Sequence, residues 1–185
     1  MITVVSGLPR SGTSLIMQML QKGGMEILTD NARKADESNP KGYFEYEKVK
    51  ALQRDSSWLQ DGDGKAVKII AQLLKYLPSY FEYKIIFIER NMEEILLSQE
   101  KMLEKMGQKT QSHNTVLSNI FKKQIEDTKK WLEFQNNIST LYITHRDAIF
   151  HALETAKQIN EFLGFNLNEK EMMQVVDPSL YHQRV

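Results

Sequence analysis

The sequence predicts a three-layer α/β fold in which a central parallel sheet of about five strands is flanked by helices. Short apolar runs rich in β-branched residues alternate with segments whose apolar residues recur at helical spacing, which is typical of a parallel sheet with crossover helices. Hydrophobic residues make up 41% of the 185 residues, which suits a chain that buries a core. We find no internal repeat, low-complexity tract or linker, and therefore expect a single domain over residues 1–185.

The composition excludes several classes of protein. Lysine and arginine number 24, as do aspartate and glutamate, so no overall basic field would attract nucleic acid. The chain has no cysteine, which excludes disulfides, cysteine-ligated zinc and a thiol nucleophile. Its apolar runs are too short to cross a bilayer, and an apolar run from residue 2 leaves no room for a secretory signal. We expect a cytoplasmic protein that does not engage a membrane and that binds any anion in a local site.

The amino-terminal half is expected to begin with a strand and to alternate between strands and helices. The expected strands are residues 2–5, 25–28 and 66–70. The expected helices span about residues 11–21 and 45–54, and a shorter helix ends at Pro78. Glycines 23 and 24 end the first helix. Residues 29–46 are polar and carry turn signals, and loops of this length inside a compact domain are usually functional or mobile.

The carboxyl-terminal half continues the alternation. Residues 84–88 form the clearest buried strand, and Asn91 is placed to cap a helix that reaches about residue 106. A longer helix spans about residues 115–136, and its expected inward stripe is Val116, Leu117, Ile120, Phe121, Ile125, Thr128, Trp131 and Leu132. Residues 141–143 form the last strand. The stripe Ile149, Leu153, Ala156, Ile159 and Leu163 predicts one helix that ends at Gly164, and Asn168 opens a final short helix.

The loop after the first strand has the spacing of a phosphate-binding loop. Residues 7–14 read GLPRSGTS, and the apolar positions of a helix follow at once. A strand–loop–helix unit of this kind directs backbone N–H groups and the positive end of a helix dipole at one point, which suits a phosphate or a sulfate. The pattern differs from the ATP-binding P-loop because Thr13 replaces the lysine and the positive charge comes earlier, at Arg10. We therefore predict a P-loop-type fold with an anion site, rather than a plain strand-to-helix turn.

This loop resembles the 5'-phosphosulfate loop of PAPS-dependent sulfotransferases, where PAPS is 3'-phosphoadenosine 5'-phosphosulfate. The likeness is to a small bacterial-type member and extends over most of the chain. It implies that PAPS is the sulfuryl donor and PAP, the 3',5'-bisphosphate, the product. It also implies that the phosphosulfate is held by Arg10, Ser11, Gly12, Thr13 and Ser14.

The same resemblance assigns three further residues. An arginine at the end of a strand and a serine two helical turns into the next helix hold the 3'-phosphate in this family, and Arg90 and Ser98 have that placement. A guanidinium fork and a hydroxyl suit a phosphate, although an exposed arginine and an ordinary helical serine are the alternative. Lys68 matches a family lysine near the bridging oxygen of the donor, where it would stabilise the leaving phosphate. The alternative for Lys68 is a strand-end lysine that reaches to solvent.

The sequence departs from the cytosolic small-molecule enzymes at two places. Ile70 stands where those enzymes have a histidine base, and their carboxyl-terminal Arg-Lys-Gly loop is absent. Protein-tyrosine sulfotransferases use a glutamate from the segment after the first helix, and here the candidates are Asp36, Glu37, Glu45 and Glu47. We prefer Glu45 because neighbouring aromatic residues would desolvate it and raise its pKa, although a solvated glutamate at the start of a helix is the alternative.

We therefore expect a sulfotransferase that carries a sulfuryl group from PAPS to a hydroxyl or amine, with no metal. Arg10, Lys68 and Glu45 would be catalytic, and the acceptor would be a small molecule or a glycan. One alternative is an ATP-dependent P-loop kinase that acts on a small molecule, and another is a non-catalytic nucleotide-binding module of the same fold. The triplet at residues 145–147 reads His-Arg-Asp, like a kinase catalytic loop, but Ala152 stands where that loop needs asparagine. We interpret this triplet as the start of a helix.

Overall fold

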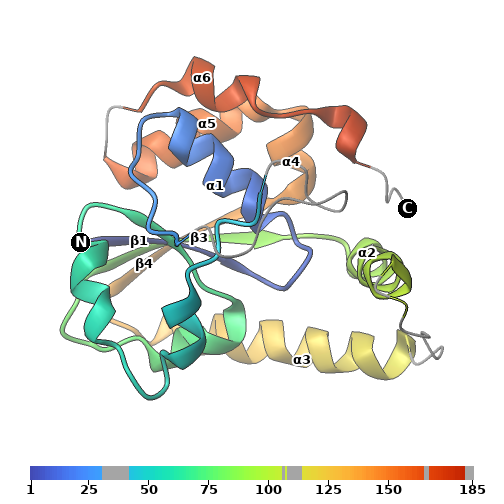
Figure 1. Cartoon of the computed structure of the whole chain (residues 1–185), viewed down its shortest axis with the longest axis horizontal. Coiled ribbons are helices and arrows are strands. Elements are labelled where there is room, and N and C mark those ends of the chain that lie inside the picture. The colour runs from blue at the N-terminus through green and yellow to red at the C-terminus, as the bar shows by residue number, and fades with distance from the viewer. Residues whose placement is uncertain (31–41, 106, 108–113, 165–166, 182–185) are drawn as a thin grey trace.

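The computed structural model describes residues 1–30, 42–105, 107, 114–164 and 167–181. Its centre is a parallel sheet of four strands in the order β2-β1-β3-β4 (Figure 1). The strands are β1 (Ile2–Gly7), β2 (Ala66–Lys68), β3 (Tyr83–Glu89) and β4 (Ile138–Thr144). The α/β class, the parallel sheet and the flanking helices predicted from the sequence are all confirmed.

The expected fifth strand, at residues 25–28, forms only an isolated bridge between Ile27 and Ala66. Two backbone hydrogen bonds hold it to β2, from Leu28 N to the Ala66 carbonyl at 2.8 Å and from Ala66 N to the Glu26 carbonyl at 2.9 Å. The segment cannot lengthen because Met25 N still bonds to the Leu20 carbonyl at the end of the preceding helix. The partner strand β2 also has only three residues, since the chain turns away after Ile69 instead of continuing to residue 70.

Helices cover both faces of the sheet (Figure 1). One face carries α1 (Thr13–Lys22), α4 (His145–Phe150), α5 (Ala152–Leu163) and α6 (Glu169–Gln174). The other face carries α3 (Asn114–Glu133) and the 3-10 helices η1 (Glu47–Ala51), η2 (Ser57–Gly62) and η3 (Ala71–Tyr76). Helix α2 (Met92–Lys105) lies beyond the carboxyl end of β3, and the last element is η4 (Pro178–Leu180).

Alternating side chains of the central strands fill two separate cores. Val4 and Phe87 join the core that contains Trp58 and Leu132, under η2 and α3. The neighbouring positions Val5, Ile86 and Ile88 join the core that is shared with α1 and α5. Successive side chains of a strand point to opposite faces, and both faces of β1 and β3 are therefore buried. This two-sided burial explains why the strand sequences are apolar runs instead of alternating patterns.

The structure confirms several element boundaries that were predicted from residues at helix ends. Asn91 caps α2, because its side-chain oxygen accepts a hydrogen bond from Glu93 N at 2.8 Å. Asn168 caps α6 in the same way, with Glu171 N as the donor at 3.2 Å. Gly164 ends α5 with a left-handed φ of 68°. The 145–147 triplet does begin a helix, α4, and Thr144 is its N-cap.

Three predicted helical features are wrong in detail. The single helix expected to end at Gly164 is two helices, because His151 leaves helical geometry between α4 and α5. The helix expected at 45–54 is the shorter 3-10 helix η1. The inward stripe of α3 fails at its start, where Val116 is 59% and Ile120 is 56% exposed. The start of α3 extends beneath α2 and away from the sheet, and the core is reached only near Leu132 (Figure 1).

Candidate functional site

Three parallel strands end at the edge of the sheet where the predicted site residues gather. Strand β1 pairs with β2 on one side and with β3 on the other, in register from Val5 with Lys68 and from Gly7 with Ile88. Because all three run in the same direction, the loop after β1, Lys68 and Arg90 reach the same edge. Ligands of open α/β sheets bind at such carboxyl ends.

The loop from β1 to α1 has a backbone that only a few residues tolerate. Arg10 has a φ of 70° and Gly12 a φ of 108°, both in the left-handed region. Ser11 N closes the turn by donating to the Leu8 carbonyl at 3.1 Å. Gly12 is the N-cap of α1 and has no side chain that could bond the N–H groups of Thr13 and Ser14. The start of α1 thus presents amide groups and the positive end of its dipole, as an anion site requires.

The loop packs so closely against its neighbours that no side chain could be added at Gly7 or Gly12. A Cβ at Gly12 would lie 2.4 Å from Cδ2 of His145. A Cβ at Gly7 would lie 2.6 Å from both the Ile88 carbonyl oxygen and Ser11 Oγ. Ser11 Oγ is buried and has no hydrogen-bond partner among the described residues. Packing against Ile88 of β3 and His145 of α4 therefore holds the loop in place.

Hydrogen bonds join the loop to the second predicted phosphate subsite. Arg10 Nε donates to Ser98 Oγ at 3.0 Å, and Arg90 Nη1 donates to the Arg10 carbonyl at 3.0 Å. Residues 10, 90 and 98 come from a loop, a strand end and a helix, yet they form one bonded group. The structure therefore brings the predicted 5'- and 3'-phosphate residues together on one edge.

Lys68 lies at the end of β2 and points to the same loop. Its Nζ donates to the Tyr43 carbonyl at 2.9 Å and to Ser14 Oγ at 3.3 Å. The ammonium also lies 6.0 Å from the centre of the Tyr43 ring. Lys68 is half-buried, so it is not simply a strand-end lysine in solvent. Lys68 and the Ser14 hydroxyl of the loop are thus within hydrogen-bond distance of each other.

The two candidate bases that the structure describes are Glu45 and Glu47. Glu45 is half-buried in the segment after Tyr43, and its carbonyl accepts a hydrogen bond from Thr29 Oγ1 at 2.8 Å. Glu47 is exposed and pairs with Lys50 at 2.7 Å. Lys50 Nζ donates the hydrogen bond to Glu47, and this bond raises the pKa of Lys50. Asp36 and Glu37 lie outside the described residues, and Ile70 is 37% exposed.

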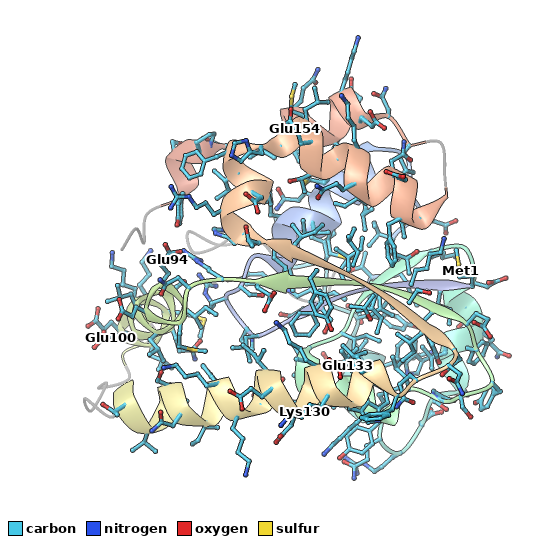
Figure 2. All side chains as sticks on the ribbon, turned by 180° about the vertical axis from the view of Figure 1, so that it is seen from behind. Met1, Glu94, Glu100, Lys130, Glu133 and Glu154 are labelled. Atoms are coloured by element: carbon cyan, nitrogen blue, oxygen red, sulfur yellow. The ribbon has the colours of Figure 1, made fainter. Side chains whose placement is uncertain are left out.

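Sequence reasoning missed a buried carboxylate beside Arg90. Glu94 Oε2 accepts from Arg90 Nε at 2.8 Å, and Glu94 Oε1 accepts from the hydroxyl of Tyr181. Burial pushes the pKa of Glu94 up, but the hydrogen bonds from Tyr181 and Arg90 outweigh burial and hold this pKa below its usual value. Figure 2 places Glu94 on α2, on the side that faces the carboxyl-terminal segment. Arg90 precedes the N-cap of α2 and Glu94 lies in the first turn of that helix, so the pair joins the strand end to the helix.

His145 was also missed as a site residue. It is 8% exposed, its ring lies edge-on to Tyr181 with centroids 5.2 Å apart, and it touches the loop at Gly12. Burial and the nearby Arg90 charge lower the pKa of His145 to about 4, so its ring is neutral near neutral pH. No sequence pattern places a residue after β4 beneath the loop after β1, because that contact depends on the sheet order.

The described part of the chain holds no group of three or more histidine, aspartate or glutamate residues that could bind a metal ion. No helix in the same part is long and apolar enough to cross a membrane.

The fold defines an α/β protein of the P-loop type, and the residues predicted to bind anions lie at one edge of its sheet. A family model described as a sulfotransferase domain matches residues 2–183, and the chain belongs to that family. Among solved structures, a sulfotransferase domain from the curacin biosynthetic pathway has a TM-score of 0.60 at 13% identity, over 95% of this chain and 77% of that chain.

A second solved structure with the same fold is mouse sulfotransferase SULT7A1 complexed with PAP. Its TM-score is 0.51 at 18% identity, over 97% of this chain and 63% of that chain. This chain therefore spans less than two thirds of the mouse protein. No curated protein matches the sequence.

Proposed function

We propose that this protein transfers a sulfuryl group from PAPS to a hydroxyl or amine of an acceptor. The observation that carries the proposal is the bonded group of Arg10, Arg90 and Ser98, which links the two predicted phosphate subsites. A donor with phosphates at both ends of its ribose needs two anion sites a fixed distance apart on one edge. The neighbouring loop amides and Lys68 Nζ add further donors to that edge.

PAPS would supply the sulfuryl group, whose bond to the bridging oxygen breaks as a bond to the acceptor forms. The loop amides of residues 11–14 would hold the 5'-end, and Arg90 with Ser98 would hold the 3'-phosphate. Arg10 and Lys68 would stabilise the negative charge that grows on the leaving phosphate, since fixed cations are most effective where charge develops. Positioning and charge neutralisation would supply most of the rate enhancement, as in phosphoryl transfer.

Glu45 is our candidate for the base that takes the proton of the acceptor. It follows Tyr43, whose carbonyl accepts from Lys68 Nζ, so the backbone of its segment passes beside the site. From this segment Glu45 would take the proton of an acceptor bound over Lys68. The small molecules and glycans expected as acceptors would approach from this side.

The experiment is a screen of hydroxyl and amine acceptors with sulfur-labelled PAPS, with and without magnesium. We expect label transfer that needs no magnesium. Lys68→Met should lower kcat by about a hundredfold, because a charge that acts in the transition state is lost.

Glu45→Gln should lower kcat by a factor on the order of a hundred or more if Glu45 is the base. Glu47→Gln is the matched control, because Glu47 lies two residues away and is exposed beside Lys50. Equal activity of the Glu45 and Glu47 variants would remove Glu45 from the mechanism. Label transfer that is absent for every acceptor, despite tight PAP binding, would favour the non-catalytic module.

A further inference from the structure

Glu94 is a buried carboxylate with two hydrogen-bond partners, Arg90 nearby in the sequence and Tyr181 near the carboxyl end. The residue is 4% exposed, and its two oxygens are taken by different donors, Oε2 by Arg90 Nε and Oε1 by the hydroxyl of Tyr181. A buried charge is strongly unfavourable unless it is paired and hydrogen-bonded, so such an arrangement holds all three groups in place.

The division of the two oxygens determines how Arg90 lies. An arginine and a carboxylate left to themselves favour a two-pronged pair in which both oxygens accept from one guanidinium. Here the Tyr181 hydroxyl occupies Oε1, and the Nη1 group of Arg90 bonds instead to the Arg10 carbonyl at 3.0 Å. The Nη1 group of Arg90 is thereby directed to the loop and not to Glu94.

The Tyr181 ring fixes the plane of the same guanidinium. The Arg90 Cζ atom lies 5.5 Å from the centre of the ring, a contact of the cation–π kind. The ring is itself held edge-on by His145 at 5.2 Å and by Phe150 at 5.9 Å, both from α4.

The backbone that delivers Tyr181 is ordered by its own bonds. Ser179 N donates to Asp177 Oδ1 at 2.9 Å, and Tyr181 N donates to the Pro178 carbonyl at 3.2 Å, which closes η4. The carboxyl-terminal segment therefore reaches α2 as a hydrogen-bonded turn, and Tyr181 is only 9% exposed.

We propose that Tyr181 and Glu94 are positioning residues that orient Arg90 toward the 3'-phosphate of the nucleotide. This inference rests on the proposed function, and it gives the carboxyl-terminal segment a role in selecting nucleotides that carry a 3'-phosphate. Without the Tyr181 hydroxyl, Arg90 would pair with both oxygens of Glu94 and turn away from the phosphate. The segment around Tyr181 would thus act on the 3'-phosphate through Arg90.

The test compares the affinities for PAP and for ADP, which lacks the 3'-phosphate, by calorimetric titration without magnesium. Tyr181→Phe keeps the ring and removes the hydroxyl. We expect this variant to lower the affinity for PAP about tenfold, because a hydrogen bond from Arg90 to the 3'-phosphate is weakened. The affinity for ADP should not change. Tyr83→Phe is the matched control, because it also removes a part-buried tyrosine hydroxyl. That hydroxyl donates to the Pro78 carbonyl at 3.1 Å and lies outside the site.

Glu94→Gln is the second variant, in case Tyr181→Phe is poorly folded. It keeps the size of the side chain and removes the charge that fixes Arg90, so the ratio of PAP to ADP affinity should again fall. A wild-type preference for PAP that both variants retain would overturn the inference and leave the proposed function intact. Equal losses for PAP and ADP would also overturn it, since they indicate a merely structural role. A wild-type protein that does not prefer PAP would overturn the proposed function itself, and the inference with it.

Discussion

Gly12 shows how one residue without a side chain can serve both the loop and its support. Its φ of 108° is unfavourable for any residue with a Cβ, and the space that a Cβ would need is filled by the ring of His145. That ring cannot move aside easily, because Tyr181 packs against it at 5.2 Å.

We predict that Gly12→Ala lowers the free energy of unfolding by about 2–4 kcal/mol, through backbone strain and a buried clash together. Gly24→Ala is the control, because Gly24 has a φ of 100° and nothing within 4 Å of the added Cβ. Strain alone should then cost about 1–2 kcal/mol. Urea unfolding of both variants measures the difference, and equal losses would contradict the packing role of His145.

At this scale, the sequence was informative where function requires a local pattern. The loop residues 10–14 and the pair Arg90 and Ser98 were predicted from the resemblance of their local motifs to the sulfotransferase family, and the structure joins Arg10 to Arg90 and Ser98 by hydrogen bonds. Glu94, His145 and Tyr181 were not predicted, because their contacts join parts of the chain that are far apart. Tyr181 and Glu94, for example, are separated by 87 positions.

At the scale of elements, the junction of β4 and α4 places a histidine inside the molecule. His145 follows the last residue of β4 and faces Arg90, Glu94 and Tyr181 from the neighbouring elements. Burial and the Arg90 charge lower its pKa from 6.5 to about 4, although the Glu94 charge opposes this. The folded protein therefore disfavours the proton that an unfolded chain would take up.

We predict that stability contributed by neutral His145 is complete above the unfolded pKa of 6.5 and is lost as pH falls from there to about 4. The loss over this window is at most about 3 kcal/mol. Glu94 acts at lower pH, because its pKa lies below 4.5 and its contribution is lost as pH falls through that lowered value. His145→Gln should flatten the pH dependence between about 6.5 and 4.5 in denaturant unfolding. Parallel curves for variant and wild type would contradict this prediction.

Element types were easier to predict than element limits. The buried strands were recognisable because both faces of β1 and β3 are covered and the runs are continuously apolar. The fifth strand failed because residues 25–28 are tied at one end to α1 and meet a partner strand of only three residues. The stripe on α3 failed at Val116 and Ile120 because periodicity does not tell how far a helix extends past its sheet.

At the scale of the whole molecule, the strand order explains why the site exists. The order β2-β1-β3-β4 puts β1 between β2 and β3, so Lys68 and Arg90 flank the same loop. The sequence predicted a parallel sheet but not this order, because the order depends on which faces the crossover helices cover. Membership of the sulfotransferase family agrees with this arrangement over residues 2–183.

The two predicted phosphate subsites would together select a 3',5'-bisphosphate nucleotide. The most direct test is calorimetric titration of the wild-type protein with PAP, and with ATP in the presence and absence of magnesium. Arg90→Ala should be titrated alongside. We predict that PAP binds without magnesium and more tightly than ATP, and that Arg90→Ala removes this preference. Tighter binding of ATP with magnesium would contradict the account and would favour a P-loop kinase.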